Sequence, residues 1–459
     1  MASTPTTVEA GRVVPPGKIV FYRSTWFAAL VLGLCNFCAP GIWGAMSSLG
    51  AGGAAEPWAV NAANALTFCL MVVTAFLTPT VVKLVGVRWT LAIGAAGYAP
   101  YAAGLYTNTK FGNQWFLLLG AALCGISAGT FWAIEAAIAL TYSEPYNQGK
   151  FLGWWLSFRV GGQILGGAIN LGINIDRADR AAGSVNPKVY IIFIVIQALG
   201  PFVAFLLPSP KKVQRTDGIT VRIKIENSLV AELKATAKLF FSKKYLLLVP
   251  FIVQAVFSEA FNFTFIALHF SVRARALGSF LSAIVAIILG NTLGFYLDRK
   301  RISLKVRART AWIAIVVLQG ALWTWSTVIQ TEFHRTGARY DWIPTELNHM
   351  FCYFLVGSIV EENVDIVRVG GLLRATESAA QAVSYGLNSV QSFSTVGSSS
   401  LNFGLWGFAI LPAWLIVSQI GVKYFGRGER EAAEAKALAE GGANSSETSS
   451  DLNEKPFEK

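Results

Sequence analysis

The sequence predicts an all-α polytopic membrane protein made of two six-helix bundles, with about twelve transmembrane helices. Three observations indicate this class. Of the 459 residues, 54% are hydrophobic and only 14% are charged, a balance that soluble proteins rarely show. Apolar runs of about 20 residues, the length of a helix that crosses the hydrocarbon core, recur along the chain. One long basic stretch divides these runs into two sets.

The first bundle is expected to span residues 25–207, after a polar tail at residues 1–24. Glycine, proline and charged residues separate its apolar segments and favour loops. Its expected helices are 25–45, 58–82, 89–106, two within 120–174, and 189–207.

A basic cytoplasmic loop, residues 208–244, follows this bundle. Leu229, Leu233 and Phe240 share one face of a helix in this loop, which predicts a basic helix lying on the membrane surface. The alternative is a solvated linker.

The second bundle is expected to span residues 245–425, before a largely disordered tail at residues 426–459. Its expected helices are 245–270, 278–297, 310–329, a short or irregular tenth helix near 350–360, 370–390 and 403–424. The apolar run of the tenth helix is short for a membrane span.

Residues 120–174 carry glycines and polar groups at helical spacing. Gly125, Gly129 and Trp132 lie at steps of four and three residues, which places them on one face of the fourth helix. A similar face of the fifth helix consists of Arg159, Gln163, Gly166 and Asn170. Because small residues let helices approach closely in a bilayer, we expect a tightly packed hairpin with a buried polar seam.

Glu135 and Arg159 lie at similar depths in this hairpin, and a charge inside an apolar helix needs an interior partner. One hypothesis makes Glu135 a proton-coupling or gating acid and Arg159 its counter-ion. The alternative is a fixed ion pair that locks the hairpin. The nearby tryptophans Trp132, Trp154 and Trp155 are expected to pack or to anchor the helices.

The eleventh helix carries a polar stripe at three- and four-residue steps, formed by Arg374, Glu377, Gln381, Tyr385 and Asn388. Arg374 and Arg159 both lie near helix starts, and the fifth and eleventh helices are equivalent in a two-repeat architecture. The stripe therefore predicts one wall of a central cavity. The alternative is an Arg374–Glu377 pair with no ligand.

Further polar residues fall inside other apolar segments. Glu259 and Asn262 lie three residues apart on the seventh helix, so Glu259 is a second candidate proton site. Three asparagines, Asn36, Asn61 and Asn64, are either cavity donors or interhelical hydrogen-bond partners.

Loop charges predict how the chain is oriented in the membrane. The net charge of +12 falls in loops between apolar helices, which favours anionic lipid headgroups over nucleic acid as the partner. With twelve helices, Lys and Arg are in excess on the side of both termini. The positive-inside rule then places both termini in the cytoplasm. It does not distinguish the plasma membrane from an endomembrane.

A loop motif follows the eighth helix and indicates a family. Gly294-Phe-Tyr-Leu-Asp298-Arg299-Lys300-Arg301 resembles the G-x-x-x-D-R-x-x-R signatures of the major facilitator superfamily. The same superfamily has two six-helix bundles joined by a long cytoplasmic loop. In the first half the motif is only a remnant, with Lys83 where the acid is expected.

A finer resemblance is to the fungal uncoordinated-93-like branch of this superfamily. It is carried by residues 123–137, Tyr142-Ser143-Glu144-Pro145, residues 159–174 and Arg273-Ala274-Arg275-Ala276-Leu277. The resemblance implies either a transporter or a partner of other membrane proteins, because animal members are described as potassium-channel regulators or receptor-trafficking chaperones.

We therefore expect a secondary transporter that moves a small solute by alternating access. The alternative is a non-transporting partner that regulates or escorts another membrane protein. Enzymatic function is not expected, because metalloprotease, nucleophile-elbow and Walker motifs are missing. We also expect no metal and no cofactor. The Cys35-x-x-Cys38 pair lies inside the first helix without a second ligand pair nearby.

Overall fold

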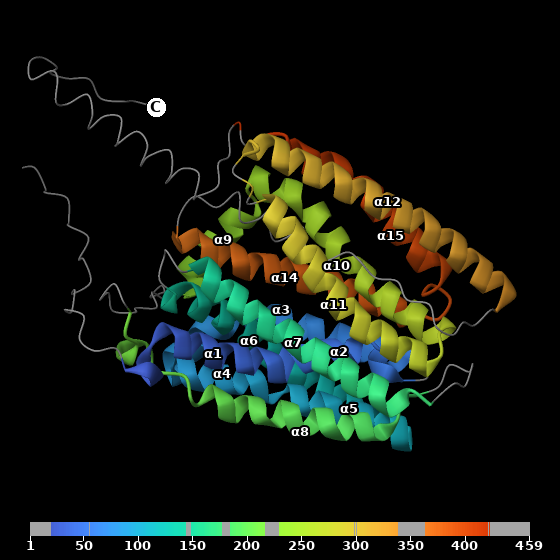
Figure 1. The fold of residues 1–459 in the computed structure, drawn as a ribbon, viewed down its shortest axis with the longest axis horizontal. Coiled ribbons are helices and arrows are strands. Elements are labelled where there is room, and N and C mark those ends of the chain that lie inside the picture. Colours follow the sequence, from blue (N-terminus) through green and yellow to red (C-terminus); the bar gives the residue numbers. More distant parts are fainter. Residues whose placement is uncertain are drawn as a thin grey trace, which may run out of the picture.

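The computed structural model describes residues 20–54, 56–143, 148–176, 184–215, 229–297, 299, 301–337, 363–420 and 422. Within these residues, regular secondary structure is helical apart from isolated bridge residues, among them Ser24 and Gln214, which pair with each other. Most helices are long and run side by side along the longest axis of the molecule (Figure 1). Seven of the described helical stretches are both long and apolar enough to cross a membrane. The predicted all-α polytopic fold is confirmed.

The first membrane segment changes its winding in the middle. α1 (Thr25–Asn36) passes through a π-helical turn (Phe37–Gly41) into α2 (Ile42–Ser47). Pro40 lies in this turn, and because proline lacks an N–H it removes a helical hydrogen bond and favours such a widening. The N-terminal half continues with α3 (Pro57–Val85), α4 (Val87–Ala96), α5 (Tyr98–Phe111), α6 (Gln114–Tyr142), α7 (Gln148–Asn174) and α8 (Pro187–Ala204).

A short helix, α9 (Leu229–Phe240), lies in the basic connection between the halves. The sequence anticipated this helix, and its position on the membrane surface stays a prediction. The C-terminal half comprises α10 (Lys243–His269), α11 (Val272–Leu297), α12 (Leu304–Thr336), α14 (Asn363–Asn388) and α15 (Val396–Val417). The predicted tenth helix lies outside the described residues.

The last helix begins earlier than its hydropathy predicts. α15 starts at Val396 rather than Phe403, and its first turns contain Ser398, Ser399 and Asn402, which are all buried. The Asn402 side chain donates to the carbonyl oxygen of Ser398 at 2.9 Å, so its polar group is satisfied within the helix. A reading of apolar runs omits such polar turns even where they are packed inside the protein.

The expectation that α6 and α7 form a tightly packed hairpin is wrong. Gly125 and Gly129 of α6 face α3, where a Cβ atom would lie 2.5 Å from the carbonyl oxygens of Thr67 and Met71, respectively. α7 packs mainly against the first membrane segment, where Gly162 lies on the π-helical turn, and against α11. Glycine spacing predicts a close helical neighbour without specifying which helix it is.

In the described part of the chain, two long seams join the N-terminal and C-terminal halves. In one, α3 lies along α14, and in the other, α7 lies along α11. We call the end of the molecule that holds α9 and the start of α1 the α9 side (left in Figure 1). The opposite end, which holds loop 49–54 between α2 and α3, is the far side.

Candidate functional site

A polar cluster surrounds the ring of Trp132 on α6, where the two halves meet. The guanidinium of Arg159, on α7, lies 5.1 Å from the ring centroid. The guanidinium of Arg374, on α14, lies 4.1 Å from the same centroid. A cation this close to an aromatic ring is attracted by the ring quadrupole. The structure therefore brings together the two arginines that were predicted to occupy equivalent positions, one from each half.

Glu135 lies one turn after Trp132 and is fully buried. Its Oε1 accepts a hydrogen bond from the indole N–H of Trp155 on α7. Its Oε2 has no hydrogen-bond partner in the described part of the chain. Arg159 and Arg374 both interact electrostatically with this carboxyl group. Glu135 and Arg159 thus share one site, while the group that directly binds the acid is an indole.

Sequence reasoning assigned Trp132 and Trp155 to packing, although both belong to the cluster. A helical signal was available, because Trp132 precedes Glu135 by three residues and Trp155 precedes Arg159 by four. Residues at these steps share a helix face, so each tryptophan had to lie beside its charged neighbour.

Arg374 also pairs with an acid on its own helix. Its Nη1 lies 2.9 Å from Oε2 of Glu377, whose side chain is 3% exposed. This contact is the self-pair named as the alternative to a cavity wall. Arg374 makes this contact and the contact with Trp132 at the same time. The arginine therefore joins α14 to α6, while Glu377 on its own helix balances its charge.

Glu259 adds a second acid from the C-terminal half. The side-chain amide of Gln381, on α14, donates a hydrogen bond to Oε2 of Glu259, on α10. Both Arg159 and Arg374 interact electrostatically with Glu259 as well. Asn262 lies one turn further along α10 and is partly buried. Each half therefore supplies at least one arginine and one acid to a single polar cluster.

Other candidate residues make contacts away from this cluster. Gln163 packs against Gly44 of α2, and the buried Asn170 donates to the carbonyl oxygen of Ala45 at 3.3 Å. Both contacts lie within the N-terminal half. Asn64 accepts a hydrogen bond of 2.6 Å from the Tyr101 hydroxyl in the same half.

The basic loop motif is described only in part. Gly294 lies in α11, and Arg299 and Arg301 follow this helix as exposed residues. Asp298 and Lys300 lie outside the described residues. The role of the motif at the cytoplasmic end of the helix therefore stays a prediction.

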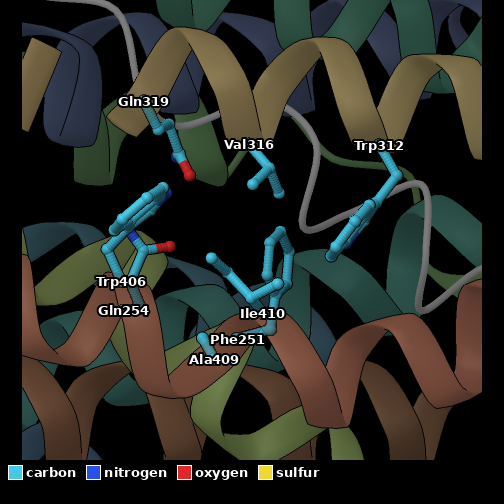
Figure 2. A pocket seen from close by; sticks show the side chains of 8 residues that line it. All are labelled: Phe251, Gln254, Trp312, Val316, Gln319, Trp406, Ala409 and Ile410. Carbon is cyan, nitrogen blue, oxygen red and sulfur yellow. The ribbon is translucent and has the colours of Figure 1, made fainter. Parts of the chain in front are cut away.

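A small, partly open pocket lies between α10, α12 and α15 (Figure 2). It is lined by Phe251, Gln254, Trp312, Val316, Gln319, Trp406, Ala409 and Ile410. The Nε2 of Gln254 and the indole nitrogens of Trp312 and Trp406 have no hydrogen-bond partner within the described residues. The lining residues include none of the predicted site residues.

The described residues offer no group of three or more His, Cys, Asp and Glu side chains that could hold a metal ion. The buried thiols of Cys35 and Cys38 are free. Cys35 donates weakly to the carbonyl oxygen of Gly200, with the two atoms 3.8 Å apart, which joins α1 to α8.

Comparisons with known proteins identify the family. The profile of the family described as "Ion channel regulatory protein UNC-93" matches residues 55–395. The "Notoamide biosynthesis cluster protein O'" of Aspergillus versicolor is 38% identical over 89% of this chain and 92% of its own length. An "UNC93-like protein" of Schizosaccharomyces pombe is 25% identical over 87% of this chain and 82% of its own length.

A solved structure supports the architecture. The crystal structure of a D-xylose-proton symporter aligns with a TM-score of 0.55, covering 86% of this chain and 96% of that protein at 15% sequence identity. At this identity the likeness shows the fold alone. The chain is therefore an integral, multi-pass membrane protein with the major facilitator fold, and it belongs to the UNC-93 family.

Proposed function

We propose that this protein is a secondary transporter, not an enzyme, and that it moves a small solute by alternating access around the Trp132 cluster. One observation carries the proposal: Arg159 from one half and Arg374 from the other converge on Trp132, beside the buried acid Glu135. Ionisable groups inside a membrane are costly and most often mark a solute or proton pathway. In this fold, such a site lies where two repeats rock against each other.

Glu135 and Glu259 are the proposed proton-coupling acids. Each accepts one hydrogen bond from a neutral donor, Trp155 or Gln381, and each interacts with both arginines. Oε2 of Glu135 has no hydrogen-bond partner among the described residues, so it can accept a proton without first losing a bond. Movement of the two halves would change the distance between each acid and the arginine of the other half, which couples protonation to conformation.

Loop charges support an orientation with the α9 side in the cytoplasm, because the excess of Lys and Arg lies there. The far side then faces the lumen or the exterior. The name of the Aspergillus relative refers to a biosynthesis cluster, which favours a small organic compound as the solute.

The second candidate function is regulation of another membrane protein without transport. The family's description as a channel regulator favours it. So does Lys83, which stands where the first-half loop motif of the superfamily has an acid.

Uptake by proteoliposomes distinguishes the two functions. The purified protein would be given a mixed extract of small metabolites, with and without an inward proton gradient, and accumulated compounds would be identified by mass spectrometry. We expect gradient-dependent accumulation of at least one compound. Glu135→Gln should slow it by roughly tenfold or more, because Gln keeps the shape of the side chain and removes the proton site.

Glu332→Gln is the matched control, since it makes the same chemical change on an exposed residue of α12. It should leave uptake unchanged. If no compound accumulates and a second membrane protein co-purifies with the chain, the regulatory function replaces the proposed one.

A further inference from the structure

Arg275 makes an unusual contact between the two halves on the far side. It belongs to α11 in the C-terminal half, and it is only 2% exposed. Its Nε–H donates to the carbonyl oxygen of Leu49 at 2.6 Å. Its Nη2 donates to the carbonyl oxygens of Gly50 at 2.9 Å and Ala54 at 3.2 Å. One guanidinium therefore binds three backbone carbonyls of loop 49–54 in the N-terminal half.

The backbone of loop 49–54 has an uncommon conformation around these carbonyls. Gly50, Ala51, Gly52 and Gly53 have φ angles of +75°, +47°, +59° and +88°. Glycine adopts such angles readily, whereas Ala51 is held in a region that side chains disfavour. These four consecutive positive φ angles fold the loop tightly enough for the carbonyls at positions 49, 50 and 54 to converge on the Arg275 side chain. Such local strain persists only where surrounding contacts over-determine it.

Further contacts place loop 49–54 and the end of α2 against the C-terminal half. A Cβ atom on Gly50 would lie 2.7 Å from the carbonyl oxygen of Phe263 on α10, so the loop backbone touches the C-terminal half. One turn after Arg275, the Ser279 hydroxyl lies 2.6 Å from the Ser48 hydroxyl and 3.2 Å from the carbonyl oxygen of Ala45. Polar bonds between α11 and the end of α2 with loop 49–54 therefore close the far side of the boundary between the halves, next to the α7–α11 seam.

We propose that Arg275 is the far-side latch: its hydrogen bonds to loop 49–54 hold the two halves together, and they break when the far side opens. That the far side opens at all rests on the proposed transport function, in which the two halves alternate in access. Charge-assisted bonds are stronger than neutral ones and offset the cost of burying the guanidinium. When the halves separate, water can replace the three carbonyls, so the arginine stabilises the closed state without making the open state inaccessible.

The fork geometry of arginine is required for this contact. Three carbonyl oxygens in different directions are bound by Nε and Nη2 of one planar group. A lysine ammonium carries the same charge but acts as a point on a flexible stem, so it can satisfy fewer of these acceptors at once. Arg275→Lys should therefore weaken the latch, and Arg275→Ala should remove it.

Thiol labelling at position 279 tests the latch without requiring transport. Ser279→Cys is introduced as a reporter, since this position is 1% exposed in the closed seam. The protein in lipid nanodiscs is treated with a water-soluble maleimide, and the labelling rate of the peptide containing residue 279 is measured by mass spectrometry. In this background we compare Arg275 with Arg275→Lys, Arg275→Ala and the control Arg335→Ala, which changes an exposed arginine at the far end of α12.

We expect Arg275→Ala to raise the labelling rate by about tenfold or more, which corresponds to about 1.4 kcal/mol. Arg275→Lys should give an intermediate rate, and Arg335→Ala no change. Equal rates in a folded, monodisperse Arg275→Lys or Arg275→Ala protein would overturn the latch. If Arg275→Ala is labelled faster and the parent protein shows no uptake in proteoliposomes, the latch is supported and the transport function is rejected. If the parent protein shows uptake and Arg275→Ala is labelled no faster, only the latch is rejected.

Discussion

Along α7 and α11 the two halves meet backbone to backbone, whereas along α3 and α14 they meet through side chains. A Cβ atom on Gly167 of α7 would lie 2.7 Å from the Cα of Phe280 on α11. In the other seam, a Cβ on Gly386 of α14 would lie 4.0 Å from the Cβ of Ala65 on α3, which is ordinary contact. The α3–α14 seam is filled instead by a stacked ring pair and an amide.

This difference indicates how each seam can move. Two backbones in direct contact have no side chains to adjust, so the α7–α11 seam is either closed or separated. Its closure is then controlled by polar bonds beside it, such as those between Arg275 of α11 and loop 49–54. A seam made of side chains can change rotamers while the helices slide, which is typical of shear motion. We infer that α3–α14 is the more adaptable contact.

The largest expected effect comes from filling the closer seam. Gly167→Ala places a methyl group where the Phe280 backbone already lies, so the helices must separate or the protein must strain. Overpacking of this kind costs about 1–3 kcal/mol. Gly386→Ala is the matched control, and it should be neutral or slightly stabilising because alanine favours helix.

The measurement is the melting temperature of the two purified variants in detergent. Gly167→Ala should melt several degrees below the parent protein, and Gly386→Ala should not. Equal melting temperatures for both variants would mean that the α7–α11 contact is as adaptable as its counterpart.

A smaller effect is expected from the amide in the α3–α14 seam. Asn61 is fully buried, and its Nδ2 donates to Thr264 Oγ1 and to the Asn388 carbonyl oxygen, each at 2.9 Å. Asn61→Ala removes both bonds between the halves. Hydrogen bonds within a membrane average about 0.6 kcal/mol, so the loss should be about 1–2 kcal/mol, including the acceptors left unpaired.

Hydrogen exchange of the peptide around Asn388 reports this loss locally, and we expect faster exchange in Asn61→Ala. Asn64→Ala provides the comparison, since Asn64 bonds to Tyr101 within one half. Faster exchange around Asn388 in both variants would indicate general destabilisation instead of a broken seam.

Much of the architecture follows from the sequence, because a membrane requires long apolar helices and makes an unpaired buried charge energetically costly. The relation between Arg159 and Arg374 was predictable for the same reason: two charges near equivalent helix starts must find an interior partner. Glu259 and Gln381 were also candidates, although their hydrogen bond across α10 and α14 was not anticipated.

The contacts that sequence reasoning missed depend on which helix lies next to which. The glycines of α6 specify a close approach, and α3 rather than α7 occupies that face. The partners of Arg275 are backbone carbonyls, which every residue has, so no side-chain pattern identifies them. Only the glycines at positions 50, 52 and 53 signal that loop 49–54 has a special conformation.

The smallest expected effect tests whether the α3–α14 seam holds through its ring pair. Phe68 of α3 and Tyr385 of α14 stack with centroids 5.5 Å apart and planes at 16°. Both rings are buried, so leucine at either position keeps most of the apolar burial and removes the stacking. A double-mutant cycle with Phe68→Leu and Tyr385→Leu isolates this term from the packing around it.

The expected coupling is about 0.5–1.5 kcal/mol, the usual range for an aromatic pair. It should be smaller than the cost of Gly167→Ala, because a side-chain contact can be replaced by neighbouring groups and a backbone contact cannot. Both quantities are measured as free energies of unfolding in the same detergent. A coupling larger than the cost of Gly167→Ala would contradict the inference that α3–α14 is the more adaptable seam. The ring pair would then be the rigid contact, and the far-side latch would act on the more adaptable seam.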